Sequence, residues 1–372
     1  MQRTRELSRW RKVAGDDEHS LVTFAWRADD KNQEVAVVSA LPGRDSSEAM
    51  ARLPGTDLWY KTYTVRNDTR ESYQFAIGGK HVTDPLNPRT HAWPDDDEIG
   101  FKGWVSSVLE LPDAPPLSWS TARPDVPKGQ LTSHRVRSNI LDNEYRVWVY
   151  TPPGYRSDGT PYGFMLVLDG WFYVNMIPTP TILDNLYADG RLPPLVAILV
   201  GSVFDETRQR DQACYPPFLD FVRSELLPWA RQTYHLTHDP AQSSIVGVSL
   251  GGLMAAFIGL HQSDIFGNVL CQSGFLGWKP QGEPEDEWIA RQYIAQPLLP
   301  LRFYIEAGLL ETQIQTLEPG WNNFLVGAPY MRDVLQAKGY TVFYSEFSGG
   351  HNPMNWQGTL ANGLLALLGQ SS

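Results

Sequence analysis

A serine lies between glycines where a β-branched run gives way to an alanine-rich run, in the segment SSIVGVSLGGLMAAFIG that begins at Ser243. Gly247, Ser249 and Gly251 form the pattern Gly-x-Ser-x-Gly, with a buried strand predicted before it and a helix directly after it. A plain packing turn is the alternative, because so short a pattern occurs by chance in many proteins. The strand–turn–helix context favours a nucleophile elbow, in which Ser249 projects its hydroxyl above the edge of a sheet.

The chain changes character near residue 112. Residues 1–111 hold short alternating runs separated by turn residues, which predict a small antiparallel β-sandwich. Five prolines between Pro112 and Pro127 predict a linker over 112–129. Residues 130–372 alternate apolar strand-like runs with helical runs, which predict a mostly parallel sheet with helices on both faces.

The composition excludes several classes of function. Lys and Arg number 31 against 42 Asp and Glu, and a net charge of −11 without a basic run argues against binding nucleic acid or an anionic membrane. Cys214 and Cys271 are too few for a disulfide framework or a structural zinc site, so no metal site is expected. There is no apolar run of bilayer length, and the basic N-terminal stretch is not followed by an apolar one, so we expect the cytoplasm.

A serine nucleophile needs a general base, and in the α/β-hydrolase order this base is a histidine on the loop after the last strand. His351, in SEFSGGHNPMNW, has that place, although an ordinary loop histidine is the alternative. The acid is expected between serine and histidine, just after the strand LRFYIEAG. Glu311 fits best by position; Glu306, inside the strand, and a serine–histidine dyad without an acid stay open.

Acyl transfer also needs N–H donors for the oxyanion. The residue after the nucleophile, Leu250, supplies one backbone N–H in this fold, and the loop after an earlier strand supplies another. The buried run LVLDGW ends in Asp169-Gly170, so the N–H of Trp171 is the expected second donor. An ordinary Asp-Gly turn is the alternative.

From Tyr145 onward the sequence resembles the enterochelin (enterobactin) esterases, of the esterase-D-like branch of the α/β-hydrolases. The segments that carry the resemblance are RVWVYTPPGY, LVLDGWF, SELLPWARQTY, VGVSLGGLMAAFIGL, CQSGFLGW, YIEAGLLE and GGHNPMNW. The segments VTFAWR, LPGTDLWYKTYTV, ESYQFAIG and DPLNP resemble the family's N-terminal sandwich domain. The resemblance therefore covers nearly the whole chain.

This resemblance implies an α/β-hydrolase fold behind a small β-sandwich. It also implies a serine esterase that cleaves the ester (trilactone) bonds of a catecholate siderophore such as ferric enterobactin and releases iron in the cytoplasm. No cofactor is then needed, and iron enters only as part of the substrate.

The segment TRQRDQACYPPF looks like the family's Arg-x-x-acid element, with Arg208 and Asp211 on the two positions. Arg208 would receive an anionic catecholate while Asp211 orients its guanidinium, and a structural ion pair is the alternative. Trp171, Trp278 and Trp321 are expected to form an aromatic wall for catechol rings, with simple packing as the alternative.

Two other functions remain possible from the sequence. One is a general or feruloyl-type carboxylesterase whose sandwich resembles a carbohydrate-binding module, although the lack of a signal peptide argues against secreted polysaccharide work. The other is a non-catalytic binding protein on a hydrolase fold. The complete order of serine, acid and histidine favours an enzyme.

Overall fold

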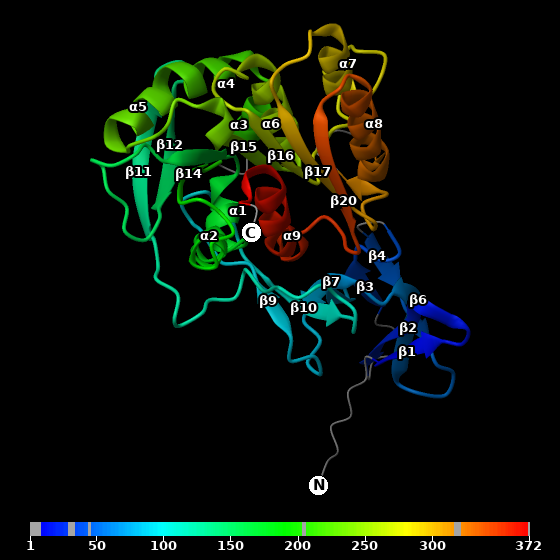
Figure 1. Ribbon diagram of the computed structural model, residues 1–372. Helices are drawn as coiled ribbons and strands as arrows, with labels where there is room; N and C mark the ends of the chain where they lie inside the picture. Colours follow the sequence, from blue (N-terminus) through cyan, green and yellow to red (C-terminus); the bar gives the residue numbers. More distant parts are fainter. Residues whose placement is uncertain (1–8, 29–33, 44–45, 203–205, 316–320, 371–372) are drawn as a thin grey trace.

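A computed structural model describes residues 9–28, 34–43, 46–202, 206–315 and 321–370 (Figure 1). Its N-terminal part consists of two antiparallel sheets. The first has the order β1 (Arg9–Val13), β2 (Asp16–Arg27), β6 (Leu58–Arg66), β5 (Ala51–Arg52). The second has the order β4 (Ser46–Ala49), β3 (Val35–Ser39), β7 (Arg70–Ile77), β10 (Val105–Glu110), β9 (Thr90–Ala92), with β8 (Lys80–Val82) beside β7.

The alternation of these strands places every second side chain between the two sheets. Phe24 of β2 and Phe75 of β7 are fully buried there, and the Phe24 ring meets Tyr73 edge-on at 4.7 Å. The outer face of the second sheet is turned toward the rest of the molecule. The predicted antiparallel sandwich is confirmed.

Residues 111–129 contain neither a helix nor a strand, and they connect the sandwich to an eight-stranded mixed sheet. Its first two pairings are antiparallel and the other five are parallel. The order is β11 (Gln130–Ser138), β12 (Asn143–Thr151), β14 (Leu195–Val200), β13 (Gly163–Val167), β15 (Ser243–Val248), β16 (Asn268–Gln272), β17 (Arg302–Gly308), β20 (Thr341–Phe347).

Helices cover both faces of this sheet (Figure 1). On one face lie α1 (Gly170–Asn175), α2 (Thr179–Ala188) and α9 (Pro353–Leu368). On the other lie α3 (Glu206–Gln212), α4 (Pro216–Phe221), a π-helical turn (Val222–Leu226), α5 (Leu227–Thr233), α6 (Leu250–His261), α7 (Trp288–Ala295) and α8 (Phe324–Ala337). A 3₁₀ turn (Pro240–Gln242) and a small hairpin of β18 (Ile314–Gln315) and β19 (Trp321–Asn322) complete the described elements.

Strand β13 shows why its sequence is an almost unbroken apolar run. Phe164 and Leu166 pack into the core on one face of the sheet, whereas Met165 and Val167 pack into the core on the other. A parallel strand buried on both faces needs apolar side chains at every position. The predicted fold class, an α/β-hydrolase-like sheet behind a sandwich, is confirmed. Among the described residues, we find no helix whose length and apolar character would suit a membrane span.

Candidate active site

Ser249 lies on a strained turn between β15 and α6, with φ 56° and ψ −120°. A residue with a side chain seldom adopts such a backbone, and strain of this kind gathers at functional sites. The turn closes because its neighbours lack side chains: a Cβ on Gly247 would lie 2.1 Å from the carbonyl oxygen of Gly251. A Cβ on Gly252 would likewise lie 2.8 Å from the Cα of Gly274. This is the geometry of a nucleophile elbow.

The imidazole of His351 joins the serine to a buried carboxylate. Its Nε2 lies 2.9 Å from Ser249 Oγ, and its Nδ1 lies 2.9 Å from Glu311 Oε1. Glu311 is 0% exposed, while Ser249 and His351 are partly exposed. The structure thus brings together the three residues that the sequence predicted as nucleophile, base and acid.

The loop after β17 holds the acid in place. Glu311 Oε2 accepts a hydrogen bond of 2.9 Å from the N–H of Gly308, at the end of β17. Glu306, the other candidate, is also fully buried but lies away from the imidazole, with its carboxylate bonded to Gln272, Tyr304 and Thr359. Burial raises the pKa of Glu306 to about 7, although those three hydrogen bonds lower it.

The base precedes a capped helix. Asn352 caps α9, since its side chain accepts a hydrogen bond from the N–H of Asn355, and Pro353 begins the helix. The cap places His351 directly before the N-terminus of α9. The imidazole packs edge-on against Trp356 at 4.9 Å.

The two predicted oxyanion donors lie in the first turns of two helices. Leu250 is the first residue of α6 and Trp171 the second of α1, and these helices follow the adjacent strands β15 and β13. Asp169 connects β13 to α1 with a left-handed backbone, φ 55°. A Cβ on Gly251 would lie 3.1 Å from its carboxylate, so the two turns are in contact.

The expected pairing of Arg208 with Asp211 is wrong. Arg208 donates two hydrogen bonds, of 2.8 and 2.6 Å, to Asp169 instead. Asp211 accepts hydrogen bonds from Tyr145, at 2.5 Å, and from Arg210, at 2.8 Å. Burial would lower the pKa of Arg208, but the Asp169 carboxylate raises it above its ordinary value.

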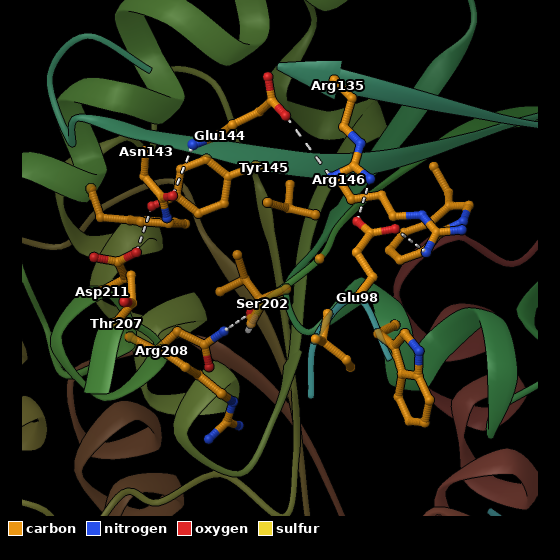
Figure 2. Close-up of a pocket in the computed structure, with 18 residues that line it drawn as sticks. Glu98, Arg135, Asn143, Glu144, Tyr145, Arg146, Ser202, Thr207, Arg208 and Asp211 are labelled. Atoms are coloured by element: carbon orange, nitrogen blue, oxygen red, sulfur yellow. Dashed lines mark hydrogen bonds and ion pairs between the residues drawn. The ribbon is translucent and has the colours of Figure 1, made fainter. Parts of the chain in front are cut away.

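Chain spacing suggested the wrong partner because Asp169, 39 residues earlier, becomes a neighbour only through the sheet. Arg208 and Asp211 line a pocket of about 210 Å³ beside β12 and β14 (Figure 2). Glu98 reaches this pocket from the N-terminal sandwich and pairs with Arg135 and Arg146.

Of the three tryptophans expected to form an aromatic wall, the two whose side chains the structure describes, Trp171 and Trp278, are buried. Trp278 is only 8% exposed and packs edge-on against Trp288 at 5.9 Å, so burial assigns it a packing role in the core. The Trp171 side chain is buried and donates to Asp96 Oδ2 at 2.7 Å, which fastens the sandwich to α1. The side chain of Trp321 lies outside the described residues.

A cleft of about 710 Å³ opens onto His351 from the sandwich side. Its far wall is the outer face of the second N-terminal sheet, which we call the sandwich wall. The lining comprises Val38, Ser39, Ala40, Ser46, Ser47, Glu71, Ser72, Tyr73, Gln74, His81, Trp93, Trp104 and Ser106, opposite His351 and Asn352. No role was predicted for these N-terminal residues from the sequence.

Two tryptophans dominate the sandwich wall. Trp93 and Trp104 stack with ring centroids 4.4 Å apart and planes 17° from parallel, and Trp104 remains 41% exposed. These two tryptophans stand directly before and after the segment from Pro94 to Gly103. That placement is the one feature of the sequence that could have pointed to an aromatic wall here. In the described part of the chain, no group of three or more His, Cys, Asp or Glu side chains is placed to hold a metal ion.

Comparison with known protein families identifies the class of enzyme to which this chain belongs. A family model described as "Putative esterase" matches residues 138–367. The chain belongs to this esterase family. A second model, "Enterochelin esterase, N-terminal", matches residues 21–120, so the resemblance found in the sequence is confirmed. This esterase is a carboxylic ester hydrolase.

Its relatives share both domains. The esterase is 27% identical to an iron(III) enterobactin esterase of Escherichia coli O6:H1, over 96% of this chain and 90% of that one. It is 28% identical to an iron(III) enterobactin esterase of Dickeya dadantii, over 95% and 89%. It also superposes with a TM-score of 0.77, at 25% identity over 98% and 96% of the chains, on the enterobactin esterase of Shigella flexneri solved in the presence of enterobactin.

Proposed function

We propose that this esterase hydrolyses the ester bonds of a catecholate siderophore such as ferric enterobactin. The observation that carries the proposal is that His351, which is linked to Ser249 and Glu311, lines a cleft whose opposite wall carries the stacked pair of Trp93 and Trp104. The cytoplasm as the site of iron release remains a prediction from the sequence.

The hydrogen bonds around His351 support a two-step acyl transfer. His351 takes the Ser249 proton as Oγ attacks the ester carbonyl carbon, and the N–H groups of Leu250 and Trp171 receive the oxyanion. The C–O bond then breaks, and His351 gives the proton to the departing seryl alkoxide. Water attacks the acyl-enzyme with His351 as base, which releases the acid and restores Ser249. This chemistry requires no metal, and iron enters as part of the substrate.

The cleft supports an aromatic substrate. An exposed face of Trp104, backed by Trp93, offers an aryl ring an offset-stacked partner. The relatives are named iron(III) enterobactin esterases, and the Shigella flexneri enzyme was solved in the presence of enterobactin. A second structure of that enzyme was solved in the presence of 2,3-dihydroxy-N-benzoyl-serine. A ferulic acid esterase of Anaeromyces mucronatus is 16% identical, which shows a shared fold alone.

The test compares hydrolysis of ferric enterobactin with that of methyl ferulate by the same protein. We expect a higher kcat/KM for ferric enterobactin, and faster turnover of methyl ferulate would overturn the siderophore proposal. A protein that hydrolyses neither substrate, and whose Ser249 is not labelled by a fluorophosphonate, would be a non-catalytic binding protein.

Trp104→Ala tests the role of the sandwich wall. We expect KM for ferric enterobactin to rise about twofold to tenfold, since stacking on an aromatic ring contributes about 0.5–1.5 kcal/mol beyond area burial. The matched control is Trp10→Ala, because Trp10 is similarly exposed on the sandwich but lines a different cavity. Equal KM values for the two variants would contradict the stacking role.

A further inference from the structure

We infer that Glu71, in the N-terminal sandwich, is a positioning residue that holds His351 against Ser249. The inference rests on the serine chemistry of the proposed function but not on the identity of the substrate. It assigns the sandwich a part in the catalytic step in addition to the wall of the cleft.

Glu71 forms hydrogen bonds with the residues on both sides of His351. Its Oε2 accepts a hydrogen bond of 2.6 Å from the N–H of Gly350, and its Oε1 accepts one of 2.7 Å from the side-chain amide of Asn352. Those two residues flank His351 directly. Glu71 is 2% exposed, so both bonds are made to an ionisable group away from water, where charge-assisted hydrogen bonds are strong.

The carboxylate is itself held in place. Glu71 Oε1 also accepts a hydrogen bond of 2.9 Å from the N–H of Ser72. The approach is tight, because a Cβ on Gly350 would lie 2.3 Å from the Cβ of Ala40 and 2.9 Å from Glu71 Oε2. Only a glycine therefore fits at position 350, against Ala40 and Glu71. Strand β7, which carries Glu71, also contributes the N–H of Arg70, which donates to the carbonyl oxygen of Ser348 at 3.2 Å.

The sandwich also holds the loop of the acid. The carbonyl oxygen of Gly43 accepts hydrogen bonds from the N–H groups of Thr312 and Gln313, at 3.2 and 3.1 Å, and from the Thr312 hydroxyl. Thr312 directly follows Glu311. The sandwich therefore holds both the loop that carries His351 and the loop that carries Glu311.

The position of the imidazole thus depends on Glu71. Loss of its hydrogen bonds releases residues 350–352 from β7, while Ser249 stays fixed by its own turn. A displacement of about 1 Å at a reacting group costs about a hundredfold in rate. A purely structural domain contact would instead lower stability and leave the rate of the chemical step unchanged.

The test reverses the hydrogen bond between Asn352 and Glu71, so that the side chain at position 71 becomes the donor and the one at position 352 the acceptor. In Glu71→Gln the new amide N–H₂ opposes a donor, either the Gly350 N–H or the Asn352 amide. In Asn352→Asp two carboxylates face one another. In the double variant, Gln at 71 donates to Asp at 352 and accepts from Gly350, and Asp still caps α9, so that only the Ser72 N–H loses its acceptor.

The readout is the rate at which a fluorophosphonate labels Ser249 in the full-length protein, with kcat and KM for p-nitrophenyl butyrate beside it. We expect each single variant to lose about tenfold to a hundredfold in labelling rate and kcat with little change in KM. The double variant should return to within about threefold of wild type.

Glu110→Gln is the matched control, because Glu110 forms ion pairs within the sandwich, with Arg70 and Arg89. It should lower stability to urea without slowing the labelling. Single variants labelled as fast as wild type, or a double variant that does not recover, would overturn the inference. Glu71→Asp keeps the charge on a shorter side chain, and we expect it to be labelled faster than Glu71→Gln. Absence of labelling in the wild type would overturn the proposed serine chemistry instead.

Discussion

The Nδ1 atom of His351 lies 2.9 Å from Oε1 of Glu311, a carboxylate without exposed surface. An ionised carboxylate can only accept, so this contact assigns the proton to Nδ1 and leaves Nε2 free to accept from Ser249. The tautomer required for a general base is therefore set by the buried acid. It follows that the three residues act as one unit.

We expect Ser249→Ala and His351→Ala each to lower kcat on the order of a thousandfold or more, because members of such a unit fail together. Steady-state hydrolysis of p-nitrophenyl butyrate measures the loss. The double variant should be no slower than either single variant. Losses that multiply in the double variant would contradict a shared role.

Glu311→Gln should lower kcat less than Ser249→Ala does, because the acid orients the base without reacting itself. We expect the two losses to differ by about one to two orders of magnitude. Glu306→Gln serves as the control, since its side chain is equally buried but bonded to Gln272, Tyr304 and Thr359. The same ester assay applies to both. A larger loss in Glu306→Gln would mean that Glu306 is the acid.

Glu306 should make the stability of the protein depend on pH. Burial raises its pKa from 4.5 to about 7 in the folded state, so the folded protein holds this proton more tightly than the unfolded chain. Its contribution is fully present below pH 4.5 and is lost as the pH rises to about 7, by an amount on the order of 3 kcal/mol. Urea unfolding of wild type and Glu306→Gln across this range isolates the effect. Parallel curves for the two proteins would rule it out.

Arg208→Met should lower the free energy of unfolding by about 3–5 kcal/mol, because it leaves the fully buried Asp169 carboxylate without its cation. Arg223→Met is the matched control. Arg223 also donates two hydrogen bonds to one carboxylate, that of Asp264, but both side chains are well exposed, so the loss should stay below about 1 kcal/mol. Urea midpoints compare them. Similar losses in the two variants would contradict the role of burial.

The reacting residues could be predicted because each belongs to a local pattern with a fixed place in the fold. Ser249 stands in a glycine pattern between strand and helix, and Glu311 and His351 follow the ends of two strands. Parallel strands deliver the loops at their carboxyl ends to one edge of a sheet. Chain order is then enough to bring the three side chains together.

The supporting contacts could not be predicted in this way, because they join elements that no local pattern relates. Arg208 bonds Asp169 through the neighbouring ends of two strands, so the nearer Asp211 was the wrong choice. Trp278 follows a strand, as a pocket residue would, but its ring turns into the core. Glu71 meets Gly350 only where the two domains touch.

The pair formed by Glu71 and Gly350 spans 279 positions of the chain. A ribosome adds about 5–20 residues per second, so the first domain waits on the order of 15–60 seconds for the segment that will cover this carboxylate. Until then the side chain stays hydrated, and neither domain has a finished surface at their contact. The nascent polypeptide therefore gains its hydrolytic power only after the segment that carries Gly350 and His351 has been translated and has closed over the sandwich.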